Sequence, residues 1–242
     1  MMHSSINKEN KPVVVIVLGM HRSGTSCLVG SLEQFGVFLG EVKTYSPFNK
    51  KGNRESPLIF RFHESIFIEN GGKWSDPPEE IVWKPEYDKK IFNILELFKG
   101  EPVWGFKDPR TLFFIEEWLK ILGDDFEVKL VGSYRHPVKV AESLFKRNGL
   151  SLENGLKVWV AYNKRLLQVC TSNDIKLINF DLPRDEYIEK LEGIAEYLSL
   201  PANDFSSFYE EGLVTVSDES VTRRLSLPSD VSQVYQKLLS YE

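Results

Sequence analysis

The fold is decided by residues 13–26, VVVIVLGMHRSGTS, close to the start of the chain. The run 13–18 is apolar and rich in β-branched residues without alternation, which is typical of a strand buried on both faces of a parallel sheet. A polar loop separates this strand from an apolar stripe at helical spacing, Leu28, Leu32 and Phe35. A buried strand, a glycine-containing loop and a helix in this order predict the opening of an α/β domain.

Strands and helices continue to alternate along the rest of the chain. Further strands are expected over residues 102–106, 126–134 and 175–180. Helices are expected over residues 61–69, 87–98, 112–122, 137–147, 152–170 and 187–198. Segment 40–57 is rich in turn-forming and charged residues, which predicts a long loop over the domain. This order predicts a three-layer α/β domain with a mainly parallel central sheet.

Composition indicates an ordinary globular protein. Of 242 residues, 42% are hydrophobic and 27% are charged, which excludes disordered, collagen-like and coiled-coil chains. Residues 1–11 are polar and are expected to form a flexible tail, and residues 12–242 to form a single domain. The longest apolar run is far shorter than the ~20 residues of a membrane span. The sequence has no basic run with interleaved aromatic residues, the pattern that would favour nucleic-acid binding.

The two cysteines, Cys27 and Cys170, are too few for a disulfide framework and lack paired metal-ligand spacing. We therefore expect reduced thiols, a cytoplasmic location and no metal.

The formal net charge is −5, but segment 181–220 alone holds eleven carboxylates and carries −9. The remainder of the chain is thus +4, so the net charge does not argue against an anionic ligand.

The loop Gly19–Ser26 has the outline of a P-loop, and the expected fold is therefore P-loop NTPase-like. In such a loop, backbone N–H groups and the helix N-terminus bind phosphate. The motif GxxxxGK[ST] places a lysine after its second glycine, but Thr25 stands there in this chain. Arg22 stands in the middle of the loop, where its side chain could reach beyond the first phosphate. The alternative is a glycine-containing turn without a ligand.

The stretch RSGTS after a buried strand resembles the 5′-phosphosulfate loop of sulfotransferases, which use 3′-phosphoadenosine 5′-phosphosulfate as donor. The resemblance implies that Ser23, Gly24, Thr25 and Ser26 hold the 5′-phosphate. It also implies that Arg22 supports the sulfonate that is transferred.

Arg135, Pro137 and Ser143 follow the strand expected over residues 126–134. Their spacing resembles a second motif of this family. In the family the arginine and the serine bind the 3′-phosphate of the donor. The chemistry is suitable, because arginine offers a planar and permanently charged fork to phosphate. Alternatively, Arg135 could pair with a carboxylate and Ser143 could face solvent.

Residues Lys107 and Asp108 end the strand before a helix, where ligands of parallel sheets collect. The segment KDP resembles that of the tyrosylprotein and bacterial sulfotransferases, which implies that Lys107 points at the sulfonate. Lys107 could also be an ordinary surface lysine at a strand end. Asp108 precedes a proline and is expected to cap the following helix.

Sulfonate transfer to a hydroxyl needs a base near the acceptor. Cytosolic small-molecule sulfotransferases have a histidine where this chain has Pro109. The tyrosylprotein branch instead resembles this chain in placing a glutamate after the first helix, which makes Glu55 the leading candidate and His63 the reserve. A solvated carboxylate beside Arg54 is the alternative for Glu55.

The pair Arg223 and Arg224 resembles basic residues near the C-terminus of bacterial members of the family. The alternative is a pair of arginines that is exposed to solvent.

The sequence therefore predicts a sulfotransferase that moves a sulfonate from 3′-phosphoadenosine 5′-phosphosulfate to an acceptor hydroxyl, with Glu55, Arg22 and Lys107 as catalytic residues. The acceptor could be a small molecule, a glycan, a lipid or a peptide. Aromatic residues of the irregular loops could line its pocket: Phe48, Trp74 and Trp83. The alternatives are a P-loop nucleotide kinase or phosphotransferase and a non-catalytic module that binds adenosine bisphosphate.

Overall fold

A parallel sheet lies at the centre of the computed structural model, which describes residues 11–47, 49, 51–201 and 226–241. Within these residues the sheet has four strands: β1 (Val13–Leu18), β2 (Val103–Lys107), β3 (Glu127–Tyr134) and β4 (Ile175–Asn179). Their order is β2-β1-β3-β4, and each neighbouring pair is parallel. The predicted parallel sheet is confirmed.

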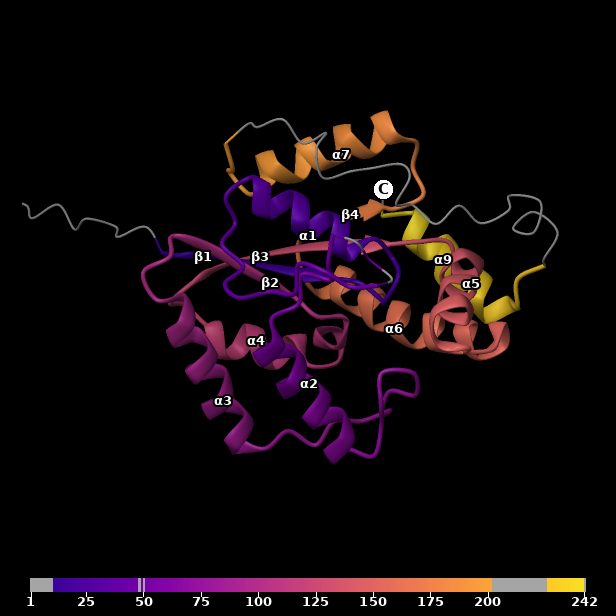
Figure 1. Ribbon diagram of the computed structural model, residues 1–242, viewed down its shortest axis with the longest axis horizontal. Coiled ribbons are helices and arrows are strands. Elements are labelled where there is room, and N and C mark those ends of the chain that lie inside the picture. Colours follow the sequence, from indigo (N-terminus) through magenta and orange to yellow (C-terminus); the bar gives the residue numbers. More distant parts are fainter. Residues whose placement is uncertain (1–10, 48, 50, 202–225, 242) are drawn as a thin grey trace, which may run out of the picture.

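Helices cover both faces of this sheet (Figure 1). They are α1 (Thr25–Gln34), α2 (Pro57–Glu69), α3 (Pro85–Leu95), α4 (Ile115–Leu122), α5 (Pro137–Asn148), α6 (Leu152–Ser172), α7 (Arg184–Tyr197) and α9 (Ser229–Leu239). In Figure 1, α1 and α7 lie above the sheet, and α4 and α6 lie below it. The three-layer α/β architecture is therefore confirmed.

The alternating side chains of β1 divide the core between these two layers. Ile16 belongs to a cluster with Trp118 of α4 and Trp159 of α6, and all three side chains are fully buried. Val15 belongs to the cluster on the other face, with Leu28 of α1. Burying such side chains stabilises the fold by about 1.5–3 kcal/mol each, which fixes β1 between two helical layers.

Three local differences from the expected elements have physical reasons. Helix α2 begins at Pro57 and not at residue 61, because proline suits the first helical position and Ser56 before it is extended. The helix expected over residues 112–122 divides into a 3-10 helix, η2 (Pro109–Phe113), and α4, because Phe114 leaves helical geometry with φ −146°. Helix α9 was not expected, and Val231, Val234 and Leu238 attach it to the core.

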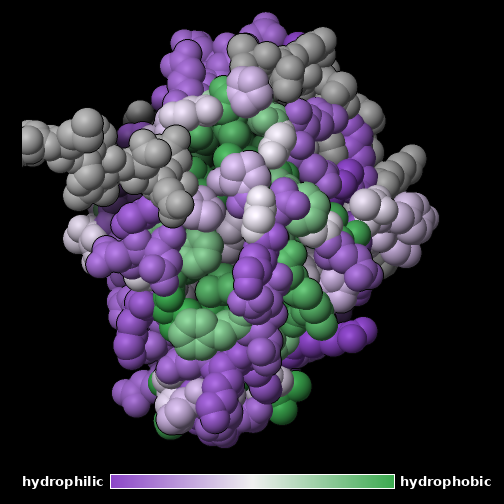
Figure 2. Space-filling view, turned by 90° about the vertical axis from the view of Figure 1, so that its left-hand side faces the viewer, coloured by the Kyte–Doolittle hydropathy of each residue, from purple (hydrophilic) through white to green (hydrophobic). Residues whose placement is uncertain are grey.

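The loops that carry the predicted site leave the carboxyl ends of β1, β2 and β3. Because parallel strands end at the same edge of a sheet, these loops converge there. Strand β1 begins at the left of Figure 1, and Figure 2 views the molecule from that side. Figure 2 therefore shows the face at the amino end of β1, opposite to the edge where these loops converge. Hydrophobic side chains are visible in the middle of that face, among hydrophilic ones. Among the described residues, no helix is both long and apolar enough to span a bilayer.

Candidate active site

Glycines shape the loop between β1 and α1. Gly24 has φ 88°, and a Cβ built on it would lie 2.2 Å from the Phe180 ring. Gly19 has φ 136°, and a Cβ there would lie 2.2 Å from the carbonyl oxygen of Ser133. Side chains at either position would therefore clash, and positive φ is costly for residues other than glycine. The loop is held to β3 by the hydroxyl of Ser133, which donates to the carbonyl of Ser23 at 2.5 Å.

The N-terminus of α1 has the features of an anion site. Gly24 is its N-cap and supplies no side-chain hydrogen bond to the first turn. The Ser23 hydroxyl is buried and has no hydrogen-bond partner in the described part of the chain. Thr25 is buried, and Ser26 donates its hydroxyl to the carbonyl of Asn53 at 3.2 Å. Backbone N–H groups and the dipole at such a terminus attract a phosphate.

Arg22 joins this loop to α5. Its Nε donates to the Ser143 hydroxyl at 2.8 Å, across 121 residues of sequence. Burial lowers the pKa of Arg22 from 12.5 to about 10, and the positive charges of Arg147 and Arg135 add to that effect. The guanidinium groups of Arg147 and Arg135 thus lie close enough to repel that of Arg22, and a bound anion would relieve this repulsion. Ser143 is buried, so it does not simply face solvent.

Arg135 is buried at the end of β3 and pairs with a carboxylate. Its Nε lies 3.2 Å from Asp181 Oδ1, and its guanidinium lies over the Phe180 ring, 5.3 Å from the centroid. The pairing that the sequence left open as an alternative is therefore present. It does not remove Arg135 from the cluster, because its charge still acts on Arg22.

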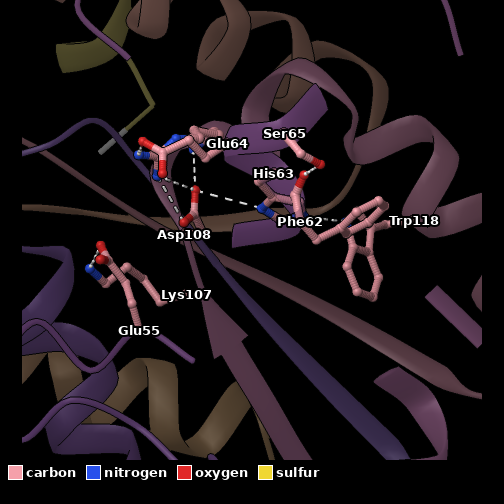
Figure 3. A network of polar contacts seen from close by, with 9 residues as sticks. Glu55, Phe62, His63, Glu64, Ser65, Lys107, Asp108 and Trp118 are labelled. Atoms are coloured by element: carbon pink, nitrogen blue, oxygen red, sulfur yellow. Dashed lines mark hydrogen bonds and ion pairs between the residues drawn. The ribbon is translucent and has the colours of Figure 1, made fainter. Parts of the chain in front are cut away.

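Glu55 and Lys107 form a buried ion pair. Lys107 Nζ donates to Glu55 Oε1 at 2.7 Å, and the two side chains are 3% and 11% exposed for Lys107 and Glu55 respectively. Glu55 is thus not a solvated carboxylate beside Arg54, which instead pairs with Glu33 of α1 at 2.5 Å. Figure 3 shows the Glu55–Lys107 pair as a group separate from the network around Asp108. An unusually low exposure for both charges marks this pair as a functional candidate.

Asp108 is the centre of a second buried network (Figure 3). It caps η2 by accepting from the Arg110 amide at 2.8 Å, as expected from its place before proline. Its Oδ2 also pairs with the Arg110 guanidinium at 3.0 Å. Burial opposes the charge of Asp108, but Arg110 and His63 outweigh it and hold the pKa of Asp108 below its usual value.

His63, the reserve base, is fully buried within that network. Its Nε2 accepts from the Trp118 indole at 3.0 Å, and its Nδ1 lies 3.6 Å from Asp108 Oδ1. Burial lowers the pKa of His63 despite the neighbouring carboxylate. A histidine enclosed in this way joins α2 to α4 and to the end of β2, and its side chain is fully buried.

Aromatic residues flank the loop at His21. The His21 ring packs edge-on against Trp74, 5.2 Å between centroids, and against Tyr162 of α6 at 5.5 Å. Burial lowers the pKa of His21 well below 6.5, and Arg110 adds to that effect. Trp83 instead packs with Tyr87 of α3 and Phe114. Phe48, Arg223 and Arg224 lie outside the described residues.

Asp181, Phe180 and Arg147 belong to the same site and were not among the predicted site residues. Asp181 and Phe180 follow β4 directly, at the edge where parallel strands place ligand-binding loops. Their position directly after a predicted strand was the feature of the sequence that could have indicated a place in the site. Arg147 lies one helical turn beyond Ser143, a spacing that puts both on one face of α5. Within the described segments no group of three or more His, Cys, Asp or Glu side chains is arranged to hold a metal.

Comparisons with known proteins give the fold. No family model and no curated protein matches the chain. Among solved structures, the sulfotransferase domain of the Synechococcus PCC 7002 olefin synthase is 17% identical, with a TM-score of 0.59, and the match covers 99% of this chain and 98% of that one. A sulfotransferase domain from the curacin biosynthetic pathway is 15% identical, with a TM-score of 0.58 and coverage of 96% and 98%. At these identities the likeness concerns architecture, and the chain has the fold of these sulfotransferase domains.

Proposed function

We propose that the protein is a sulfotransferase that moves a sulfonate from 3′-phosphoadenosine 5′-phosphosulfate to an acceptor hydroxyl. One observation carries the proposal: a guanidinium bonded to a serine, Arg22–Ser143, and a buried carboxylate–ammonium pair, Glu55–Lys107, lie at the same edge of the sheet. The first pair suits a polyanionic donor, and the second suits proton transfer. The fold supports the proposal, and residues 12–242 are taken as one domain.

The residues around α1 fit the 5′-phosphate of the donor. Gly24 leaves no room for a side chain where a phosphate must approach the backbone. The first turn of α1 has no side-chain cap, and the buried Ser23 hydroxyl has no hydrogen-bond partner in the described segments. In the proposal, Ser23–Ser26 hold the 5′-phosphate, and Arg22 contacts the sulfonate attached to it.

Arg135 and Ser143 are assigned to the 3′-phosphate. Arg135 supplies a permanent charge in a buried setting, where attraction to an anion is stronger than in water. Ser143 adds a neutral hydroxyl from the helix that follows. The repulsion that Arg135 and Arg147 exert on Arg22 favours a ligand with several negative charges over one with a single charge.

Glu55 and Lys107 are assigned to the chemical step. When bound, the donor supplies an activated sulfonate whose leaving group is a phosphate. Glu55 Oε1 is bonded to Lys107, and we assign Oε2 to accept the proton of the acceptor hydroxyl. Lys107 and Arg22 place positive charge beside the sulfonate and the departing oxygen.

The alternatives from the sequence are less well supported. A P-loop kinase requires a lysine where Thr25 stands, and it has no need for Arg135 and Ser143. A non-catalytic module that binds adenosine bisphosphate has no need for a buried Glu55–Lys107 pair, whose desolvation is costly. We place the reaction in the cytoplasm, with a small molecule, glycan, lipid or peptide as acceptor.

The test combines the purified protein and 3′-phosphoadenosine 5′-phosphosulfate with a panel of sugars, lipids, phenols and peptides, and measures adenosine 3′,5′-bisphosphate formed. With an active acceptor, Glu55→Gln should lower turnover by about a hundredfold or more while donor affinity stays near that of the wild type. Arg135→Ala should mainly weaken donor binding. Glu86→Gln, at an exposed site on α3, serves as the control. Equal and small effects of the two site variants would contradict the assignment.

A further inference from the structure

Asp181 stands at the centre of the Arg135 side of the site. Its side chain is 11% exposed and accepts hydrogen bonds from Arg135 Nε at 3.2 Å and from the His136 backbone N–H at 2.7 Å. It also forms an ion pair with Lys139 Nζ at 3.0 Å. Its own backbone N–H donates to the Asn179 side chain at 3.0 Å. A single carboxylate thus connects the loop after β4 with the end of β3 and the first turn of α5.

A carboxylate in an anion-binding site reduces its positive charge, so its presence needs a compensating role. The contacts of Asp181 supply one. A guanidinium is rigid and planar, so an acceptor on Nε fixes its plane and the directions of its terminal nitrogens. Phe180 packs on the same group, with the Arg135 guanidinium 5.3 Å from its ring centroid. The orientation of Arg135 is therefore determined from two sides.

The same segment contacts the first phosphate loop. A Cβ on Gly24 would lie 2.2 Å from the Phe180 ring, which shows how closely Phe180 fits against that loop. Phe180 thus lies between Gly24, assigned to the 5′-phosphate, and Arg135, assigned to the 3′-phosphate. Asp181, its neighbour in sequence, holds the Arg135 side chain in the orientation in which it packs on Phe180.

We propose that Asp181 is a positioning residue that orients Arg135 for recognition of the 3′-phosphate of the nucleotide. This inference rests on the proposed donor. Asp181 acts through Arg135 and the start of α5, and it does not itself contact the ligand. Its role is thus to make the site selective for a nucleotide that carries a 3′-phosphate, and not to increase affinity for anions in general.

The experiment compares two nucleotides by calorimetric titration: adenosine 3′,5′-bisphosphate and adenosine 5′-monophosphate. The ratio of the two affinities measures recognition of the 3′-phosphate. For Asp181→Ala we expect this ratio to fall about tenfold, the effect of losing one charge-assisted contact, with unchanged affinity for the monophosphate. Asp181→Asn keeps an oxygen acceptor and should lose less. In an Arg135→Ala background, Asp181→Ala should change the ratio no further.

Asp174→Asn is the matched control, because Asp174 lies just before the other end of β4, pairs with Lys176 at 3.5 Å and is exposed. A role in charge balance alone predicts that Asp181→Ala raises both affinities, and a role in folding alone predicts that both fall together. Either result would overturn the inference. If the wild type prefers the bisphosphate and Asp181→Ala retains that preference, the inference alone fails. If the wild type shows no preference, the proposed donor fails, and the inference with it.

Discussion

The buried Glu55–Lys107 pair makes a quantitative prediction about stability. With Lys107 3% and Glu55 11% exposed, removal of one partner leaves the other charge buried without its counter-charge. Such a loss costs about 3–5 kcal/mol, whereas removing both charges is far less costly. We therefore expect Glu55→Gln and Lys107→Met each to lower the free energy of unfolding by about 3 kcal/mol, and the double variant to lower it no more than either single change.

Thermal and urea unfolding of the four proteins in this cycle measure the coupling. For a chain of this size, about 3 kcal/mol corresponds to a fall in Tm of about 6–12 °C. The exposed pair Glu69–Lys84 provides the control, because its atoms lie 2.6 Å apart but its side chains are 38% and 39% exposed. The same cycle there, with Glu69→Gln and Lys84→Met, should give a coupling below about 1 kcal/mol. Equal coupling in both cycles, or additive losses at Glu55 and Lys107, would show that the buried pair is not coupled more strongly than an exposed one.

Three further outcomes follow from the geometry of single residues. Gly24→Ala should weaken binding of adenosine 3′,5′-bisphosphate by about tenfold or more in calorimetry, because the new Cβ meets Phe180, whereas Gly193→Ala in an open helical position of α7 should not. Lowering the pH from 7.5 to 5.5 should reduce the urea-measured free energy of unfolding, because the unfolded chain protonates His21 and His63 near their ordinary pKa of 6.5 and the folded chain does so only at lower pH; His63→Gln should reduce this dependence and leave the share of His21. Burial raises the pKa of Cys27 to about 11, so iodoacetamide at pH 8 should leave this thiol unmodified in the folded protein and alkylate it in urea, as measured by mass spectrometry.

Local sequence was sufficient to predict the strands of the sheet and the glycine-containing loop between β1 and α1. The β-branched run Val13–Leu18 favours a strand covered on both faces, and the structure buries Val14–Leu18 in such a strand. Gly24 was expected in a phosphate loop, and its positive φ and contact with Phe180 show why no larger residue fits. Asp108 was expected to cap the helix after β2, and it does so.

Other features depend on contacts between distant segments, which a single sequence does not reveal. His63 bonds to Trp118 across 55 residues, so its enclosure follows from the packing of α2 on α4 and not from the residues beside it. Asp181 was counted in an acidic segment, and its pairing with Arg135 depends on the neighbouring positions of β3 and β4. Helix α9 has only a short apolar stripe, and its attachment to α6 gives it a place in the fold.

The proposed function requires that this site recognises a nucleotide with phosphates at both the 5′ and the 3′ positions. Calorimetric titration with adenosine 3′,5′-bisphosphate, compared with ATP plus Mg²⁺, tests it most directly. We expect a clear preference for the bisphosphate, which is lost in Arg135→Ala. A preference for ATP with Mg²⁺ would contradict it.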